Sequence, residues 1–293
     1  MIVKEIKRKD DKLNNIRVIE KINMCNDAMF KSVFRSIEAR NVVIDFISAI
    51  TKIDKEILKD AEFVGGDIVK SNIKEKTKIS DVIIKLDDNN KIIVEMNGSY
   101  DKNIFNKNTE YAFSIQTEST LNNKRYNKTI LINIDNFNKY KTDKPILHFK
   151  LRDEYGNIEN NLYNSIHLIL ENAVKKEYNK TIEKEIINFS KFLKLGSLRE
   201  MEKEFEGDDK YMAAIRKVED LSTDPNFIGY YDLEEAHKQD IEDAKETGYD
   251  DGVAAGSSQT KIEIAKSMLK DNIDIETISK YTDLSINEIN SIK

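Results

Sequence analysis

Two segments of alternating polar and apolar residues, joined by a short turn, constrain the fold of this chain more than any other feature. Residues 79–86 and 91–97 both follow the two-residue period of a β-strand. The residues between them include Asp-Asp-Asn-Asn, which are typical turn formers. The pattern therefore predicts an antiparallel hairpin. Each strand carries one acidic residue among apolar neighbours, Asp81 on the first and Glu95 on the second.

The segments around this hairpin predict the rest of the fold. Helices are predicted at 26–37, 40–49 and 104–121, and strands at 63–69, 129–134 and 146–151. Residues 162–220 are interpreted as helices that are broken near Gly196 and Gly207. This order predicts an α/β fold in which helices flank a mixed sheet.

The chain divides into three parts by composition. We expect a charged N-terminal arm at 1–22, a domain at 23–230, and an acidic helical region at 231–293. Residues 234–293 contain 14 acidic residues and 7 lysines, so the rest of the chain is nearly neutral although the net charge is −6. A nearly neutral body allows local binding of phosphates but argues against non-specific coating of nucleic acid.

The acidic C-terminal region has two features with alternative interpretations. Gly248, Gly252 and Gly256 recur every four residues, which fits either a helix face for close packing or a flexible linker. The last helices have the size of a helix-turn-helix unit, but 259–293 holds five lysines against six acidic residues. We therefore favour a homodimer held partly by this region over direct reading of DNA bases.

Asp81 and Glu95 are candidate ligands of a divalent metal. Hydrolysis of a phosphodiester requires a hard cation that neutralises the phosphate and activates a water, and hard cations take oxygen ligands. The period of a strand places Glu95 and Asn97 on one face, with the backbone carbonyl of Met96 between them. Aspartate followed after about fourteen residues by Glu-x-polar is the core pattern of the PD-(D/E)XK phosphodiesterases. Acidic residues beside turns are common, so the spacing alone does not establish a metal site.

Further motifs, taken in order, resemble the recombination-promoting nuclease or transposase family. They are Asn26-Asp27-Ala28-Met29-Phe30-Lys31, the strands at 80–84 and 93–97, the helix carrying Tyr111, a strand ending in Asn133-Ile134, the segment 163–171, and a glycine-spaced helix before the C-terminal end. The resemblance covers about 24–293. It implies a restriction-endonuclease-like core with an α-helical C-terminal region, and metal-dependent cleavage of DNA in recombination, transposition or defence.

The resemblance also implies roles for individual residues. It makes Asp81 and Glu95 ligands of Mg²⁺ or Mn²⁺ and Asp27 a candidate third ligand, although capping of a helix explains Asp27 equally well. The wider class has a lysine two residues after the glutamate, and this family usually has glutamine. Asn97 stands there in this chain and supplies no positive charge. We still include Asn97 among the catalytic candidates.

This departure leaves a second hypothesis open, in which a catalytically weak or silent nuclease fold binds nucleic acid or regulates another protein. Four basic residues are candidates for contacts with DNA phosphates: Lys102, Lys107, Lys124 and Arg125. A solvated helix face explains Lys107 as well. Tyr100, Tyr111 and Tyr126 lie near these residues in the sequence and are candidates to line a DNA groove, although a core position is favoured for Tyr111.

Cysteine content and hydropathy indicate the compartment. The single cysteine, Cys25, cannot form an internal disulfide, which fits a reducing environment. No apolar run is long enough to span a bilayer, and the N-terminus lacks the pattern of a signal peptide. We therefore expect a cytoplasmic protein without a membrane partner. His148, His167 and His237 have no metal-ligand spacing, so zinc is not expected.

Overall fold

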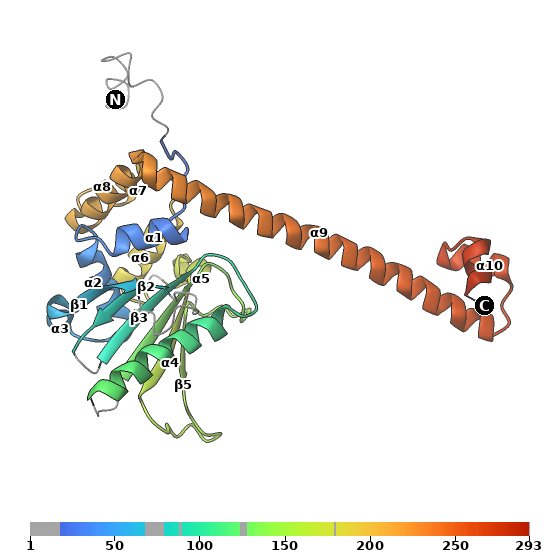
Figure 1. The fold of residues 1–293 in the computed structure, drawn as a ribbon, viewed down its shortest axis with the longest axis horizontal. Coiled ribbons are helices and arrows are strands. Elements are labelled where there is room, and N and C mark those ends of the chain that lie inside the picture. Colours follow the sequence, from blue (N-terminus) through green and yellow to red (C-terminus); the bar gives the residue numbers. More distant parts are fainter. Residues whose placement is uncertain (1–17, 68–78, 88–89, 124–127, 179, 293) are drawn as a thin grey trace, which may run out of the picture. The chain divides into compact units, whose positions relative to one another are not determined.

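The protein folds into two compact units, Met1–Glu234 and Glu235–Lys293. The structure, a computed structural model, describes residues 18–67, 79–87, 90–123, 128–178 and 180–292 (Figure 1). The first unit contains the central sheet and the predicted metal ligands.

Six strands of the first unit form a mixed sheet in the order β1-β2-β3-β4-β6-β5 among the described residues. They are β1 (Glu62–Asp67), β2 (Ile79–Lys85), β3 (Asn90–Asn97), β4 (Lys128–Asp135), β5 (Ile146–Lys150) and β6 (Tyr163–Ile169). The predicted hairpin is confirmed, because β2 and β3 pair antiparallel from Lys85↔Lys91 to Val82↔Val94. The three central strands, β3, β4 and β6, run parallel to one another. Their carboxyl ends therefore meet at one edge of the sheet.

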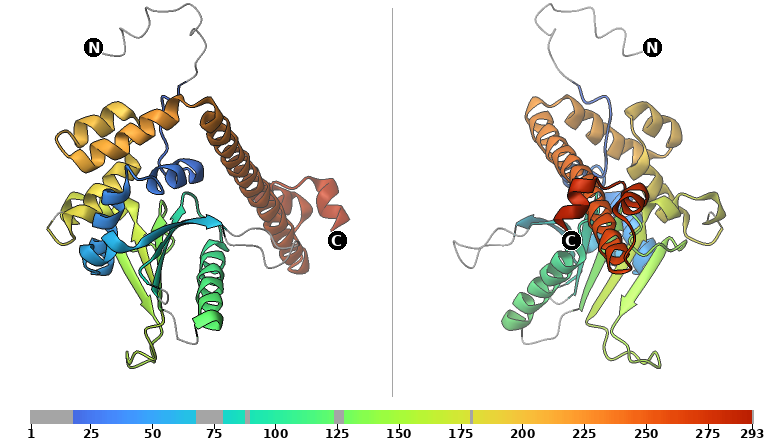
Figure 2. Two further views of the ribbon diagram at one scale, coloured as in Figure 1. Left: turned by 60° about the vertical axis from the view of Figure 1, so that its left-hand side comes forward. Right: turned by 90° about the vertical axis from the view of Figure 1, so that its right-hand side faces the viewer.

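Helices cover both faces of this sheet. The described helices of the first unit up to residue 223 are α1 (Asp27–Phe34), α2 (Arg40–Thr51), α3 (Lys55–Asp60), α4 (Ile104–Asn123), α5 (Leu170–Ala173), α6 (Lys184–Lys194), α7 (Leu198–Glu204) and α8 (Asp209–Thr223). The left view of Figure 2 shows the green α4 on one side of the sheet and the blue and yellow helices on the other. Helix α4 connects β3 to the parallel strand β4, as such a crossover requires.

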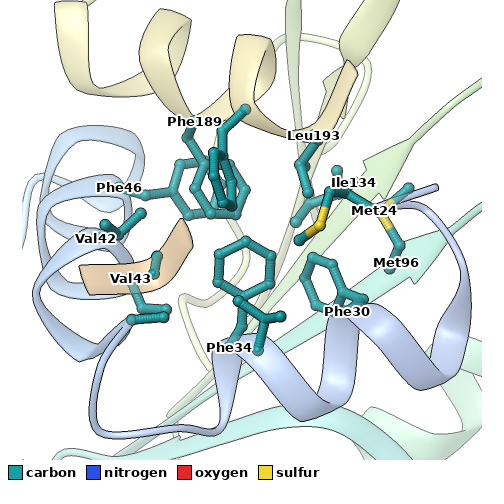
Figure 3. Close-up of a cluster of buried hydrophobic side chains, with 14 of the residues drawn as sticks. Met24, Phe30, Phe34, Val42, Val43, Phe46, Met96, Ile134, Phe189 and Leu193 are labelled. Carbon is teal, nitrogen blue, oxygen red and sulfur yellow. The ribbon is translucent and has the colours of Figure 1, made fainter. Parts of the chain in front are cut away.

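The main hydrophobic core lies between the sheet and the helices opposite α4. Alternate residues of the strands, such as Val82, Val94 and Ile132, point into it. Rings from three helices meet there: Phe34 of α1 lies 5.1 Å from Phe189 of α6 between ring centroids, and Phe189 stacks on Phe46 of α2 at 4.0 Å. Figure 3 shows these rings, with Met96 of β3 and Ile134 of β4 beside Phe30.

A smaller apolar cluster lies on the α4 side. Ile83, Ile93 and Leu131, from three neighbouring strands, pack against Tyr111, Ala112 and Ile115 of α4. Tyr111 is therefore a core residue, as favoured from the sequence. Since successive strand residues face opposite sides, Glu95 and Asn97 belong to the α4 face, whereas Val94 and Met96 belong to the main core.

The sequence-based interpretation was wrong for the start of the segment 162–220. Residues Tyr163–Ile169 form β6, which pairs with both β4 and β5, and helices follow it. The run Ile-His-Leu-Ile-Leu lacks clear alternation because a strand between two others in a parallel region is covered on both faces. Such a run cannot be distinguished from a buried helix by periodicity alone.

The last residues of the predicted N-terminal arm pack on the body of the first unit. Ile19 and Ile22 are buried, and their N–H groups donate to the carbonyls of Ser222 and Gly196. Residues 1–17 of that arm lie outside the described part of the chain.

The second unit is helical. Helix α9 (Pro225–Lys270) begins in the first unit and includes all three of the four-spaced glycines, so these residues are helical rather than a linker. Helices α10 (Ile275–Thr282) and α11 (Ile286–Ser291) follow. Their apolar residues form a small cluster with the end of α9: Ala265, Ile278, Leu284 and Ile289. The division into parts at residues 22 and 230 stays a prediction.

Candidate active site

The candidate site lies where β2 and β3 separate. Their paired register stops at Val82↔Val94, one residue before Asp81. There the carboxylate of Asp81 accepts a hydrogen bond from the backbone N–H of Met96. The N–H and C=O of one strand residue point toward the same neighbouring strand, so the carbonyl of Met96 faces the gap that the Asp81 carboxylate occupies. A carboxylate and a carbonyl oxygen are thus directed into the same opening.

Helix α1 contributes a lysine to this opening. The ammonium of Lys31 lies 3.3 Å from Oδ1 of Asp81 and 2.6 Å from Oδ2 of Asp27, one turn earlier on the helix. Arg35 of the same helix donates to the backbone carbonyl of Asp81 at 2.7 Å. Helix α1 is therefore fixed to the start of β2 through both the side chain and the backbone of Asp81.

Asp27 does not cap α1 with its side chain. The cap is Asn26, whose side-chain oxygen accepts from the N–H of Met29 at 3.1 Å. The carboxylate of Glu234 accepts from the N–H groups of Asp27 and Ala28 at 2.6 and 2.8 Å. Capping therefore does not explain Asp27, and its carboxylate faces Lys31 instead.

The electrostatics of the site favour a cation. Asp81 is 3% exposed, and burial, followed by the negative charges of Glu95 and Asp27, raises the pKa of its carboxyl well above the usual range. Lys31 and the N–H of Met96 oppose this effect. Burial lowers the pKa of Lys31, but Asp81 and Asp27 outweigh burial and raise it. Two further carboxyl groups thus act on Asp81, and the ammonium of Lys31 opposes them.

These residues fit a divalent metal by the chemistry of their donors. Carboxylate and carbonyl oxygens are the ligands of hard cations, and excess negative charge at a buried carboxyl is relieved by a cation. Within the described residues, no three His, Cys, Asp or Glu side chains are already gathered at metal-binding distance. In this structure Lys31 occupies the side of Asp81 that faces α1.

Asn97 lies beside this opening in a buried network of amides. Its Nδ2 donates to Oδ1 of Asp135 at 2.7 Å and to Oδ1 of Asn133 at 3.3 Å. Its Oδ1 accepts from Nδ2 of Asn108 at 3.0 Å, and Asn108 also donates to Asn133 at 2.8 Å. Both polar atoms of the Asn97 side chain are therefore committed to β4 and α4.

The network continues across the sheet to a histidine. Asn133 lies opposite both Glu95 on β3 and His167 on β6 in the strand register. Nδ1 of His167 lies 2.8 Å from Oδ2 of Asp135, and its Nε2 lies 3.3 Å from both Asn133 Nδ2 and Ser165 Oγ. A row of polar side chains thus runs from Glu95 to the buried imidazole.

A family model described as a PD-(D/E)XK nuclease family transposase matches residues 24–248. The chain belongs to this family. No curated protein and no solved structure gave a match. PD-(D/E)XK nucleases generally use divalent metal ions, and the mixed sheet flanked by helices is the restriction-endonuclease-like α/β fold predicted from the sequence. A search of the described helices found none long and apolar enough to cross a membrane.

The other predicted contacts of this PD-(D/E)XK protein are more peripheral. Lys107 is exposed, and its ammonium lies 3.7 Å from a carboxylate oxygen of Asp101. Lys102 is also exposed. Lys124, Arg125 and Tyr126 lie outside the described residues. The contribution of these side chains to DNA binding stays a prediction.

Sequence reasoning missed several residues that the PD-(D/E)XK fold brings to this site. Lys31 was quoted only as part of a motif, although its position four residues after Asp27 is the spacing of a helical ion pair. Asp135 and His167 were missed because they meet only when β4 and β6 pair in parallel. The detectable signal was polar residues near the ends of apolar strands, because the carboxyl ends of parallel strands share one edge.

Proposed function

We propose that this protein is a metal-dependent endonuclease that hydrolyses phosphodiester bonds of DNA, as part of a mobile element or a defence system. The observation that supports it most lies where β2 and β3 separate: the carboxylate of Asp81 accepts there from the backbone N–H of Met96, and the negative charge of Glu95 acts on it. A chain of the PD-(D/E)XK family with acidic groups at this position has the donors that such a reaction needs.

Asp81, Glu95 and the carbonyl of Met96 would hold Mg²⁺ or Mn²⁺, with Asp27 as a candidate fourth donor. When bound, the ion would neutralise the phosphate and lower the pKa of a water. We propose that Lys31 supplies the positive charge that Asn97 lacks, since its ammonium already lies 3.3 Å from Asp81. Asn97 would act through position, because its amide ties the end of β3 to Asn133 and Asp135.

Cleavage of plasmid DNA in magnesium or manganese tests this proposal. Replacing Asp81 with alanine should reduce the rate by at least about a hundredfold, and a chelator should abolish cleavage by the unchanged protein. Asp60→Ala is the matched control, because Asp60 is an exposed carboxylate at the end of α3. Equal nicking by Asp81→Ala and Asp60→Ala would overturn the assignment.

A pair of substitutions tests the role of Lys31. Lys31→Gln removes the charge and should lower kcat by about a hundredfold, the effect typical of losing one stabilising group in an active site. Lys31→Arg keeps the charge and should retain more activity. Equal rates for both variants would exclude an electrostatic role for Lys31.

The alternative is a catalytically silent nuclease fold that binds nucleic acid or regulates a partner, as Asn97 suggests. DNA binding that persists in chelator, without cleavage under any metal, would favour it. Asn97→Lys is not a clean test of this alternative, because the amide of Asn97 is buried and bonded on both sides. A lysine there would disrupt the network before it could add a charge.

We also propose a homodimer held partly by the C-terminal region, most simply with two-fold symmetry. The second unit leaves several large apolar side chains exposed: Ile264, Ile273, Tyr281 and Ile286. Light scattering on the whole protein and on a chain ending at Glu234 tests this. A cut after Tyr231 is less suitable because Glu234 binds the start of α1. The same oligomeric state for both chains would exclude this region as the dimer element.

The thiol of Cys25 is buried and forms no disulfide, which agrees with a reducing environment. The cytoplasm is the compartment that we propose.

A further inference from the structure

A continuous line of aromatic rings begins next to the candidate active site. Successive centroids along it are 5.3, 6.0, 6.0 and 5.4 Å apart, in the order Tyr100, Phe137, Phe105, Tyr140 and Phe149. We call these five residues the aromatic shelf. Tyr100 follows Asn97 by three residues and Phe137 follows Asp135 by two, so the shelf starts at the edge where the carboxyl ends of β3 and β4 meet.

The shelf is accessible from solvent. Tyr100, Tyr140 and Phe149 are 43%, 37% and 41% exposed, respectively. Exposed aromatic residues that contact one another in a line are unusual on a protein surface without a binding role. The apolar core does not require them, because none of the five belongs to a buried hydrophobic cluster of the described residues.

A buried histidine packs against three rings of the shelf and fixes their position. The imidazole of His167 meets the rings of Phe105, Tyr140 and Phe149 edge-on, at centroid distances of 4.7, 5.6 and 5.2 Å. His167 is itself fixed by Asp135. The polar network therefore orients the rings as well as the end of β3.

The loops that carry the shelf are also fixed. The N–H of Asn136 donates to the carbonyl of Asn97 at 3.0 Å, and its amide donates to the carbonyl of Gly98 at 3.2 Å. The amides of Asn138 and Asn172 both donate to the carbonyl of Thr142, at 2.7 and 2.8 Å. A preformed surface loses little conformational entropy when it binds a ligand.

Positive charge accompanies the rings. The ammonium of Lys139 lies 4.6 Å from the ring centroid of Phe105 and 5.7 Å from that of Tyr140. The segment 136–144 contains three lysines and one aspartate. Rings interleaved with lysines match single-stranded nucleic acid, whose bases stack on aromatic faces while the phosphates meet cations. A duplex does not suit this surface because its base faces are covered by their neighbours.

We propose that the aromatic shelf binds unpaired bases of single-stranded DNA and leads the strand to Asp81 and Glu95. The register places Glu95, Asn133 and His167 side by side on three adjacent strands, so the backbone of His167, whose ring contacts the shelf, lies about 10 Å from that of Glu95. Only the statement that the shelf leads the strand to Asp81 and Glu95 rests on the proposed nuclease function. Binding to the shelf does not require cleavage.

Fluorescence anisotropy with a labelled thymidine oligonucleotide, in chelator so that no cleavage occurs, tests the shelf. Tyr140→Leu should weaken binding about tenfold, the effect expected for one lost stacking partner, whereas Tyr140→Phe keeps the ring and should bind as well as the unchanged protein. Tyr230→Leu, at a 72% exposed tyrosine of α9, is the matched control. A duplex of mixed sequence should bind no more weakly to Tyr140→Leu than to the unchanged protein.

Each result gives a decision. The proposal that the aromatic shelf binds unpaired bases would be overturned if Tyr140→Leu binds the oligonucleotide as well as the unchanged protein does. It would also be overturned if binding of the oligonucleotide and of the duplex weakens equally. A change in oligomeric state that accompanies the loss would overturn it too, because the surface would then bind a second copy. If Tyr140→Leu melts at a lower temperature, Tyr100→Leu replaces it, since Tyr100 lies at the other end of the shelf, against Phe137. If Tyr140→Leu loses oligonucleotide binding as expected but the unchanged protein never cuts DNA, the nuclease proposal is rejected and the binding role of the aromatic shelf stands.

Discussion

The two faces of the central sheet are filled with different kinds of side chain. The face that packs on α1, α2 and α6 is lined mainly by aliphatic residues and phenylalanines. The α4 face has a small apolar cluster, and beyond it the buried network of Asn97, Asn108, Asn133, Asp135 and His167. Apolar packing tolerates small changes of position, whereas a hydrogen-bonded network is satisfied only in one arrangement.

This difference suggests a division of roles. The apolar face supplies most of the hydrophobic stabilisation, and the polar face fixes groups that must keep a defined orientation. The candidate metal ligands lie at the boundary, because Met96 sends its side chain into the apolar core while its backbone N–H binds Asp81. The predictions below compare the free energy of unfolding on the two faces.

The largest loss of stability is expected from the apolar face. Phe34→Ala should lower the free energy of unfolding by about 3–5 kcal/mol, because it leaves a cavity among three other phenylalanine rings. Denaturant unfolding measures this. Phe113→Ala, on the exposed side of α4, should cost less than about 1 kcal/mol. Similar losses for the two variants would contradict the assignment of the core.

A smaller loss is expected from the polar network. Asn108→Leu removes the donor to Asn97 and Asn133 and leaves two buried oxygens with fewer partners, which should cost about 1–3 kcal/mol. Asn106→Leu, on the exposed side of the same helix, is the control and should be nearly neutral. In a double-mutant cycle, Asn97→Leu and Asn108→Leu should be clearly non-additive because they share a hydrogen bond. Additive losses would show that the network does not act as a unit.

The smallest loss among buried positions is expected at the candidate site. Asp81 is buried near the negative charges of Glu95 and Asp27, and an asparagine there can still accept from the N–H of Met96. Asp81→Asn, measured in chelator, should leave the free energy of unfolding unchanged or raise it by about 1 kcal/mol. A clear decrease in the free energy of unfolding would mean that Asp81 is retained for structure and not for chemistry.

The two faces also differ in how much of them the sequence predicted. The hairpin that carries Asp81 and Glu95 is local, and its alternation and turn residues fix the register between the two acids. The α4 crossover and β4 were equally clear. In contrast, β6 was missed because a strand covered on both faces shows a continuous apolar run, and because no tight turn joins it to β5, its antiparallel neighbour in the chain.

The same reason explains the missed residues of the site. Lys31, Asn108, Asp135 and His167 come from four different elements, and their contacts depend on how those elements pack. No short-range spacing encodes such contacts. Helix α9 was missed as a single helix because three glycines are unfavourable in a helix by about 1 kcal/mol each.

The last prediction concerns charged groups at the rim of the apolar face. Asp45 of α2 lies 2.6 Å from the ammonium of Lys55 and also pairs with Lys210 of α8. Burial raises the pKa of Asp45, but Lys210 and Lys55 outweigh burial and lower it.

A lowered pKa means that the carboxylate stabilises the fold above its unfolded pKa of about 4, and that this stability is lost as the pH falls through the folded value. Asp45→Asn should therefore cost about 1 kcal/mol or less at pH 7, because solvent reaches both lysines and screens the two ion pairs. The difference from the unchanged protein should disappear in acid, as measured by denaturant unfolding at several pH values. If Asp45→Asn is still less stable than the unchanged protein at pH 3, the Asp45 side chain acts through packing or hydrogen bonding and not through its charge. It would then resemble the polar network of the α4 face.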